Sequence, residues 1–216
     1  MIKNIILMGP PGAGKGSIAK ILLQEFGLVH ISTGDMFREA IKSGSEMGKL
    51  ADSYISKGHL VPDDVTIGIV KERLSQDDTL NGFLLDGFPR TLPQAEALQE
   101  ISKQINRPIE AVINLECDTQ ELIRRISGRR VCKVCGAPYH IDTKKPLVDG
   151  VCDLCKGPLY QRNDDNEESL KVRLQHYIVD TKPLIDYYED RKLLVNFNSL
   201  VGLDILFDEI SQFLKK

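Results

Sequence analysis

The stretch GPPGAGKGS, residues 9–17, lies between the apolar run of residues 5–8 and a helical pattern over residues 18–26. We expect a strand that ends at Met8 and a helix that opens at Ser17. Backbone N–H groups at a helix N-terminus, together with the helix dipole, favour bound phosphate. The spacing fits G-x-x-x-x-G-K, the phosphate loop of nucleotide-binding proteins. Close approach and positive φ are expected at Gly9, Gly12, Gly14 and Gly16.

This loop is therefore predicted to bind a nucleoside triphosphate, with Lys15 as a point charge between phosphates. The residues expected to bind ATP here are Gly12, Ala13, Gly14, Lys15, Gly16 and Ser17. The motif departs from its usual form at one position, because Gly16 stands where a Ser or Thr normally follows the lysine. The hydroxyl that would bind Mg²⁺ is thus displaced to Ser17 or replaced. The alternative interpretation is a glycine-rich turn with a lysine in solvent.

Apolar runs alternate with amphipathic stretches along the rest of the chain. The pattern predicts strands at residues 2–8, 28–31, 82–86, 109–116 and 193–198. It predicts helices at residues 17–26, 65–76, 92–104, 118–127, 167–190 and 203–216. Such alternation indicates an α/β fold with a parallel sheet, right-handed crossovers and flanking helices. Residues 129–162 break the pattern and indicate a small inserted module.

Length and composition indicate a globular protein with one main domain. The chain has 216 residues, 42% of them hydrophobic, and a formal net charge of −3. The acidic balance argues against a dedicated nucleic-acid partner. The apolar N-terminal stretch is too short for a signal peptide or a membrane span. We therefore expect a cytoplasmic protein without a membrane or nucleic-acid partner.

Four of the five cysteines form two C-x-x-C pairs separated by sixteen residues. In a reducing compartment this spacing indicates a metal site before it indicates disulfides. Four thiolates would bind Zn²⁺ tetrahedrally and leave no open position, so the expected zinc ion is structural. The predicted ligands are Cys132, Cys135, Cys152 and Cys155. Four free thiols or a disulfide pair are the alternative, and His140 is not needed as a ligand.

Two further stretches carry a family resemblance. HISTGDMFREAI (residues 30–41) and LLDGFPRTLPQAEAL (residues 84–98), together with GPPGAGKGS, resemble the adenylate kinases among the nucleoside monophosphate kinases. The resemblance covers essentially the whole chain. It implies a phosphate-loop kinase core over residues 1–216 with two insertions, an AMP-binding helical segment at residues 32–61 and a zinc-binding lid at residues 128–165. A monomer is expected.

The resemblance implies transfer of the ATP γ-phosphoryl group to AMP, giving two ADP, with Mg²⁺ bound to ATP. The implied catalytic residues are Lys15, Arg90, Arg125, Arg129, Arg162 and Arg173. The implied AMP site comprises Thr33, Arg38, His59, Leu60, Val61, Gly87, Phe88, Pro89, Arg90, Gln94, Arg162 and Arg173. The implied ATP site adds Arg129, Pro138, Tyr139 and Val201. Physical reasoning agrees, because arginine forks match phosphate oxygens and positioning with charge neutralisation does most of phosphoryl-transfer catalysis.

Several of these residues have plainer interpretations. Gln94 could face solvent on its helix. Thr33 and Ser32 could be helix caps. Arg124, Arg125, Arg129 and Arg130 form one basic run that could be a solvated face, and we choose Arg125 and Arg129 because positions i and i+4 share a helix face.

Acidic residues mark two other places. Asp86 ends a predicted strand beside the phosphate loop, which suits a role toward hydrated Mg²⁺; a structural acceptor for loop amides is the alternative. Asp164 and Asp165 lie where the lid returns. The resemblance implies bonds across the lid for them, whereas the local sequence alone indicates an N-terminal helix cap.

Two other functions remain open from the sequence. A kinase for UMP, CMP or GMP would use the same loop and arginines. The hypothesis from a different functional class is a zinc-ribbon protein that binds nucleic acid and uses ATP as a switch. The acidic net charge argues against it.

Overall fold

The computed structural model describes residues 1–216. Its strands are β1 (Asn4–Met8), β2 (Val29–Ser32), β3 (Phe83–Asp86), β4 (Ala111–Glu116), β5 (Arg129–Cys132), β6 (Pro138–His140), β7 (Leu159–Tyr160) and β8 (Leu194–Asn198). Its helices are α1 (Lys15–Phe26), α2 (Thr33–Ser43), α3 (Glu46–Ile55), α4 (Asp63–Leu74), α5 (Leu92–Gln104), α6 (Thr119–Ser127), α7 (Glu167–His176), α8 (Pro183–Glu189) and α9 (Leu203–Leu214). A 3₁₀ turn, η1 (Asp77–Asn81), and a π turn, η2 (Tyr177–Thr181), complete the chain.

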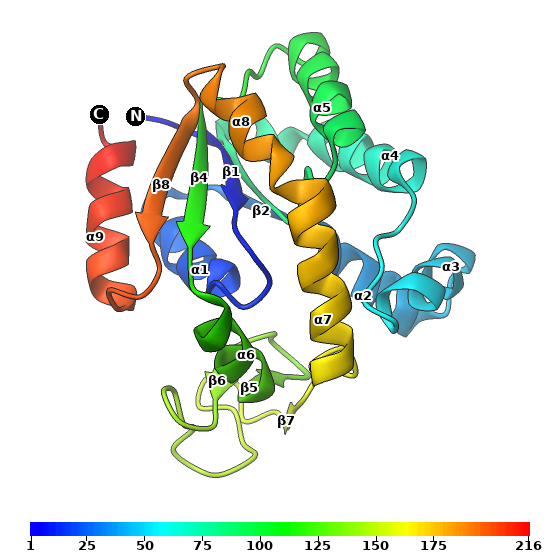
Figure 1. Ribbon diagram of the computed structural model, residues 1–216, viewed down its shortest axis with the longest axis vertical. Helices are drawn as coiled ribbons and strands as arrows, with labels where there is room; N and C mark the ends of the chain where they lie inside the picture. Colours follow the sequence, from blue (N-terminus) through cyan, green and yellow to red (C-terminus); the bar gives the residue numbers. More distant parts are fainter.

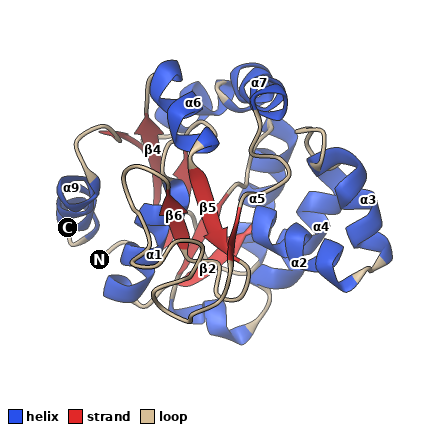
Figure 2. Ribbon diagram, turned by 90° about the horizontal axis from the view of Figure 1, so that it is seen from below, coloured by secondary structure: helices blue, strands red, loops and turns tan.

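Five strands form a parallel sheet in the order β2-β3-β1-β4-β8, with helices on both sides (Figures 1 and 2). The predicted α/β class with a parallel sheet is confirmed. After β1 the chain crosses to β2 on one side of the sheet, whereas β4 lies on the other side of β1. The sheet order therefore reverses at β1, and ligands of such sheets bind at the carboxyl ends of the strands near this point.

Side chains that alternate along the strands form two apolar clusters, one on each face of the sheet. Ile6, Phe83 and Leu85 belong to a cluster of 18 buried residues that α4, α5 and α8 cover. Ile5, Leu7, Leu84 and Ile113 belong to a cluster of 14 that α1 and α9 cover. Burial on both faces explains why these strands are continuous apolar runs in the sequence.

Residues 129–160 hold a separate three-stranded antiparallel sheet in the order β6-β5-β7. It lies at the lower end of the molecule in Figure 1, below α6. The sequence indicated an insertion here without showing its strands, because each has only two to four residues. Helices α2 and α3 pack together beside the main sheet, where the second insertion was expected.

The helix predicted over residues 167–190 is divided into α7, η2 and α8. Pro183 has no backbone N–H and its ring disfavours regular helical bonding to the preceding turn. The chain widens ahead of it, and Lys182 N donates to Tyr177 O, five residues back, at 2.7 Å. No helix in the structure has the length and apolar character needed to span a membrane.

Candidate active site

The phosphate loop joins β1 to α1, as predicted. Lys15 is the first residue of α1, and its Nζ donates to Gly9 O at 2.7 Å and Pro10 O at 2.9 Å. The loop thus encircles the lysine ammonium group. Burial lowers the pKa of Lys15 from 10.5 to about 8, although the nearby Asp86 carboxylate raises it. An anion bound beside Lys15 would therefore strongly stabilise its charged form.

Glycine is required at the two ends of this loop. Gly9 has φ 138°, and a Cβ there would lie 2.7 Å from Leu115 O. Gly14 has φ 96° at the start of α1. The expected positive φ is wrong for Gly16, which has ordinary backbone within α1 and no atom within 4 Å of an added Cβ. The loop conformation therefore depends on Gly9 and Gly14. A side chain added at Gly16 would extend into open space.

Side chains that follow β2 and β3 meet at one backbone carbonyl. Thr33 Oγ1 donates to Gly87 O at 2.9 Å, and Arg90 Nε donates to the same oxygen at 2.8 Å. The α2 cap is Ser32, whose hydroxyl accepts from Asp35 N. Thr33 is therefore not used as a cap and lies against the Gly87–Arg90 loop, with Phe88 buried beneath it.

Gln94 is buried, with 2% of its surface exposed, so the solvent-facing alternative is wrong. Its Oε1 accepts from Arg90 N at 2.7 Å, and its Nε2 donates to Asp63 Oδ1 at 2.6 Å. Thr91 Oγ1 donates to the other oxygen of Asp63 at 2.9 Å. Gln94 thus fixes the backbone of Arg90 and lies beside the pocket that contains Thr33 and Val61.

Two largely buried ion pairs fix the base of the lid, one between its two ends and one to α7. Arg129 Nε donates to Asp165 Oδ2 at 2.8 Å, and a second bond joins the same two side chains. Arg173 Nη1 donates to Asp164 Oδ2 at 2.9 Å. The N-cap of α7 is Asn166 instead, whose Oδ1 accepts from Ser169 N. The bonds across the lid implied by the resemblance are therefore present, and the cap interpretation of both aspartates is wrong.

Of the basic run, Arg125 and Arg129 point inward, but the predicted shared helix face is wrong, because α6 ends at Ser127 and Arg129 belongs to β5. Arg125 Nη1 reaches Ala13 O of the phosphate loop at 3.4 Å, and its Nη2 donates to Ser199 O at 2.9 Å. Both Arg124 and Arg125 pair with Glu121, but Arg124 does not reach the phosphate loop and has 49% of its side chain exposed. Val201 follows Ser199 and packs, partly buried, against the apolar cluster under α1.

Arg38 and Arg162 converge from the two insertions. Arg38 Nη2 lies 2.6 Å from Asp35 Oδ1, and Arg162 Nη2 lies 3.8 Å from the same oxygen. Arg162 Nε is buried without a hydrogen-bond partner. A buried donor without a partner is costly, so this guanidinium is suited to an anion that the protein itself does not supply.

The site concentrates positive charge. Burial lowers the pKa of Arg173 to about 10, and Arg129 and Arg90 lower it further while Asp164 raises it. Burial also lowers the pKa of Arg90, with Asp86 acting in the opposite direction and Arg38 in the same one. Several buried cations with few counter-charges form an environment that polyanionic ligands neutralise.

Asp86 ends β3, in register with Leu7 and Ser32. Its Oδ2 lies 3.6 Å from His30 Nε2, and its charge acts on Lys15 and Arg90. None of its oxygens accepts a bond from the loop amides. The Asp86 carboxylate thus lies at the carboxyl edge of the sheet beside the phosphate loop. This position suits contact with the water shell of a cation.

A pocket lies between α2, the Gly87–Arg90 loop and α7. Its volume is about 70 Å³, and its walls include Thr33, Gly34, Phe37, Arg38, Ile55, Gly58, His59, Leu60, Val61, Thr66, Gly87, Arg90, Gln94, Asp164 and Arg173. Sites for ligands of nucleotide size measure several hundred Å³. In this conformation the pocket is therefore smaller than a nucleotide site. The side chain of His59 points away to His176.

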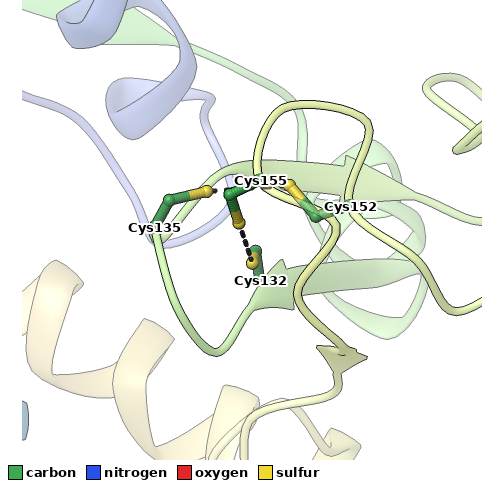
Figure 3. Close-up of side chains that lie close together, drawn as sticks. All are labelled: Cys132, Cys135, Cys152 and Cys155. Atoms are coloured by element: carbon green, nitrogen blue, oxygen red, sulfur yellow. Dashed lines mark hydrogen bonds between the residues drawn. The ribbon is translucent and has the colours of Figure 1, made fainter.

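The four predicted zinc ligands come together in the lid (Figure 3). Cys132 Sγ lies 3.4 Å from Cys155 Sγ, and Cys135 Sγ lies 3.6 Å from Cys152 Sγ. All four sulfur atoms are within 4.8 Å of one another. These separations exceed a disulfide bond of about 2.05 Å and suit four ligands about 2.3 Å from one zinc ion.

Other lid side chains surround this Cys₄ cluster. Tyr139 is buried, and its hydroxyl bonds to Cys152 Sγ at 3.5 Å. This bond lowers the pKa of Cys152 to about 6, which favours the thiolate that a metal requires. His140 is turned toward Arg124 O and the amides of Asp142 and Thr143, so it is not among the possible ligands. The Tyr139 side chain faces the cysteines, and only its backbone and Pro138 remain for contact with a nucleotide.

Comparison with known proteins gives a consistent result. A family model described as adenylate kinase matches residues 7–193. This chain belongs to the adenylate kinase family. It is 54% identical over 207 residues to the adenylate kinase of Desulforamulus reducens, covering 96% of this chain and 97% of that protein. Identity is 51% over 211 residues to the Bacillus licheniformis adenylate kinase (98% and 97% covered) and 50% over 213 residues to that of Methanothrix thermoacetophila (99% and 99%).

The protein is thus an enzyme with adenylate kinase function, and its substrates are the nucleotides ATP, AMP and ADP. Sequence reasoning missed several residues of the site. Asp63, which holds Gln94, and Ser199, which holds Arg125, carry no local signal, because their partners are 31 and 74 residues away. Lys20 was also missed; its Nζ donates to Gly136 O in the lid at 3.0 Å, a contact between α1 and the Cys₄ cluster.

Proposed function

We propose that the phosphate loop binds the β-phosphate of ATP and part of its γ-phosphate, and that AMP occupies the pocket beside Thr33 and Gln94. The buried ammonium of Lys15, encircled by loop carbonyls, is the observation that carries the ATP side. The AMP phosphate would bind Arg38 and Arg90. An oxygen of this phosphate attacks the γ-phosphorus, the bond from the γ-phosphorus to the bridging oxygen breaks, and two ADP result. The acceptor phosphate is already ionised, so no general base is needed.

The roles of the arginines follow from their positions. Arg129 and Arg173 lie close enough to Lys15 to lower its pKa, Arg129 has the same effect on Arg162, and Arg125 contacts the phosphate loop. We propose that they neutralise the charge of the transferring phosphoryl group. Asp164 and Asp165 hold Arg173 and Arg129 in place before substrate binds. Such preorganised charge contributes most to catalysis where water is excluded.

We propose that residues 128–165 and 32–61 move as two covers over the nucleotides. The structure supports a closed arrangement, because Lys20 bonds to Gly136 in the lid and Arg162 of the lid faces Asp35 of α2. Closure of this kind excludes water, which would otherwise compete with AMP for the γ-phosphoryl group. Because the 70 Å³ pocket is smaller than a nucleotide site, the segment over AMP would open between turnovers.

Two metals are included in the proposal. Cys132, Cys135, Cys152 and Cys155 would hold a structural Zn²⁺ that stabilises the lid. Asp86 would orient water on the Mg²⁺ that accompanies ATP and lowers the charge repulsion between phosphates. Ser17 lies in the first turn of α1, where the displaced hydroxyl of the loop motif would meet the same water shell.

We also propose that the enzyme acts as a monomer, because one chain supplies all the arginines. Four cysteines ready to ligate a metal favour a reducing compartment such as the cytoplasm.

The test of the acceptor site is ADP formation from Mg-ATP with AMP, UMP, CMP or GMP in turn, using zinc-replete protein. We expect fast turnover with AMP alone. Conversion of Gln94 to Leu should raise the KM for AMP and release Asp63, whereas a surface control, Glu96→Gln, should behave as wild type. Equal turnover with another monophosphate would keep the phosphoryl-transfer mechanism and contradict the assignment of the AMP pocket.

A further inference from the structure

Two histidines meet at the edge of the proposed AMP pocket. His59 Nδ1 lies 3.0 Å from His176 Nε2, and their rings are arranged edge to face with centroids 5.3 Å apart. His59 follows α3, in the segment proposed to cover AMP, while His176 is the last residue of α7. The two imidazoles therefore join two parts of the molecule that are far apart in the sequence. Neither side chain has a role in phosphoryl transfer.

Asp180 fixes the orientation of the His176 ring. His176 Nδ1 lies 2.7 Å from Asp180 Oδ2, so the ring carries its proton on Nδ1 and directs the lone pair of Nε2 at His59. Carboxylates hold metal-ligating histidines in this way and increase their basicity. Asp180 lies within the π turn η2. Such turns are rare and often mark functional sites.

The histidine pair borders a wide, open cavity that adjoins the proposed AMP pocket and shares His59, Leu60 and Val61 with it. The cavity has a volume of about 690 Å³, and its walls include Lys57, Asp63 and Asp180 beside the two histidines. It provides an entry path and room for water ligands. Asp63 is occupied by Gln94 and Thr91, whereas His59 Nδ1 and His176 Nε2 bond only to each other.

We propose that His59 Nδ1 and His176 Nε2 bind a divalent transition-metal ion such as Zn²⁺, Ni²⁺ or Cu²⁺, with water completing its shell and Asp180 as a positioning residue. Imidazole is a preferred ligand for these ions. Two nitrogen ligands on one tetrahedral ion, each about 2.0–2.1 Å from it, lie about 3.3 Å apart. The exposed His59 ring would carry its proton on Nε2 instead of Nδ1 and tilt so that both lone pairs point at the ion.

A bound ion would clamp the AMP-covering segment onto α7. The backbone already approaches α7 closely here, because a Cβ on Gly58 would lie 2.8 Å from Ser169 O. Arg173, which we place at the transferring phosphoryl group, is on the same helix one turn before His176. Metal binding and AMP binding should therefore favour the same closed arrangement, and each should strengthen the other by the same factor. This coupling rests on the proposed function, whereas metal binding itself does not.

The binding test is calorimetric titration with Ni²⁺ of protein whose lid is loaded with zinc, with zinc content measured before and after. We expect one Ni²⁺ per chain with micromolar affinity at pH 7.5 and loss of binding at pH 5, because the ligands must be neutral. His59→Gln and His176→Gln should each weaken binding at least tenfold. Asp180→Asn keeps both imidazoles and should weaken it about tenfold or more.

Gln175→Ala, next to His176 on the exposed side of α7, is the matched control and should bind Ni²⁺ like wild type. Absence of Ni²⁺ uptake by wild type, or equal uptake by wild type and His176→Gln, would overturn the site.

The coupling test compares the affinity for AMP with and without saturating Ni²⁺. We expect tighter AMP binding in the presence of Ni²⁺ for wild type and no change for His176→Gln. If Ni²⁺ binds without altering AMP affinity, the clamp is wrong. Failure of the phosphoryl-transfer proposal would show differently, as lost AMP specificity in the Mg-ATP assay without Ni²⁺.

Discussion

The kinase core and the lid are held together by different forces. The core buries apolar clusters of 18 and 14 residues on the two faces of its sheet. The lid buries one cluster of four residues, two of which are cysteines of the proposed zinc site. A buried large side chain contributes about 1.5–3 kcal/mol, so the core can fold on apolar burial and the lid cannot. We therefore propose that the lid, held by a bound metal and a few ion pairs, opens while the core stays folded.

The largest effect should come from the core side of the site. Arg90→Ala is expected to lower kcat by about 10³-fold, because it removes a cation from the phosphoryl-transfer region. The sheet should remain folded, which circular dichroism and the melting temperature can verify. Retention of normal turnover by this variant would count heavily against the site assignment.

Zinc removal should separate the two regions. Chelation of zinc, or Cys155→Ser, is expected to unfold the lid and lower turnover by about 10²-fold or more, since Arg129 and Arg162 lose their positions. Hydrogen exchange should speed up in residues 129–160 and stay slow in the five-stranded sheet. Cooperative loss of protection across both regions would show that the lid and the core fold as one unit.

The ion pair across the lid base should contribute less than zinc but more than a surface pair. Asp165 has a side chain with no exposed surface, and Asp165→Ala leaves Arg129 unpaired. We expect the lid to lose about 3 kcal/mol of stability, measured by hydrogen exchange. Lys171→Ala, which breaks the exposed pair with Glu167, is the control and should change stability by less than about 0.5 kcal/mol.

The pH dependence of ATP binding should report on Lys15. Its pKa of about 8 in the free protein means that the ammonium is charged below pH 8 and neutral above it. Bound phosphates favour the charged form, so ATP should bind about tenfold more weakly at pH 9 than at pH 7. The free energy of unfolding should change with pH in the opposite direction. Burial penalises the charged form of Lys15, so the stability of the fold should rise between about pH 8 and 10.5. Lys15→Arg should flatten the binding profile.

The smallest effect should come from the contact between core and lid. Lys20→Gln weakens the bond to Gly136 O and should shift the lid toward its open form by two- to fivefold, consistent with about 0.5–1 kcal/mol. Fluorescence energy transfer between labels on the lid and α9 would measure this shift. Lys215→Gln, which removes an exposed pair with Glu25 of α1, should leave the lid unchanged.

Some of the site was predictable because its signals are local. The phosphate loop and the Cys-x-x-Cys pairs bring their residues together within a few positions. Gln94 shows the limit of such reasoning, because a glutamine on a helix is buried only if a distant partner such as Asp63 receives it. The acidic pair 164–165 looked like a cap until Arg129 and Arg173 were placed opposite it.

The sequence by itself determined the five strands of the main sheet and their parallel arrangement, the phosphate loop and the four cysteines of the proposed zinc site. These features depend on periodicity and spacing over a few residues, which the chain carries wherever it folds. The tertiary structure alone decided which arginines face inward, how the acidic residues hold them, and that His59 meets His176. Those outcomes depend on distances between residues tens of positions apart, and only the packing of helices on the sheet sets such distances.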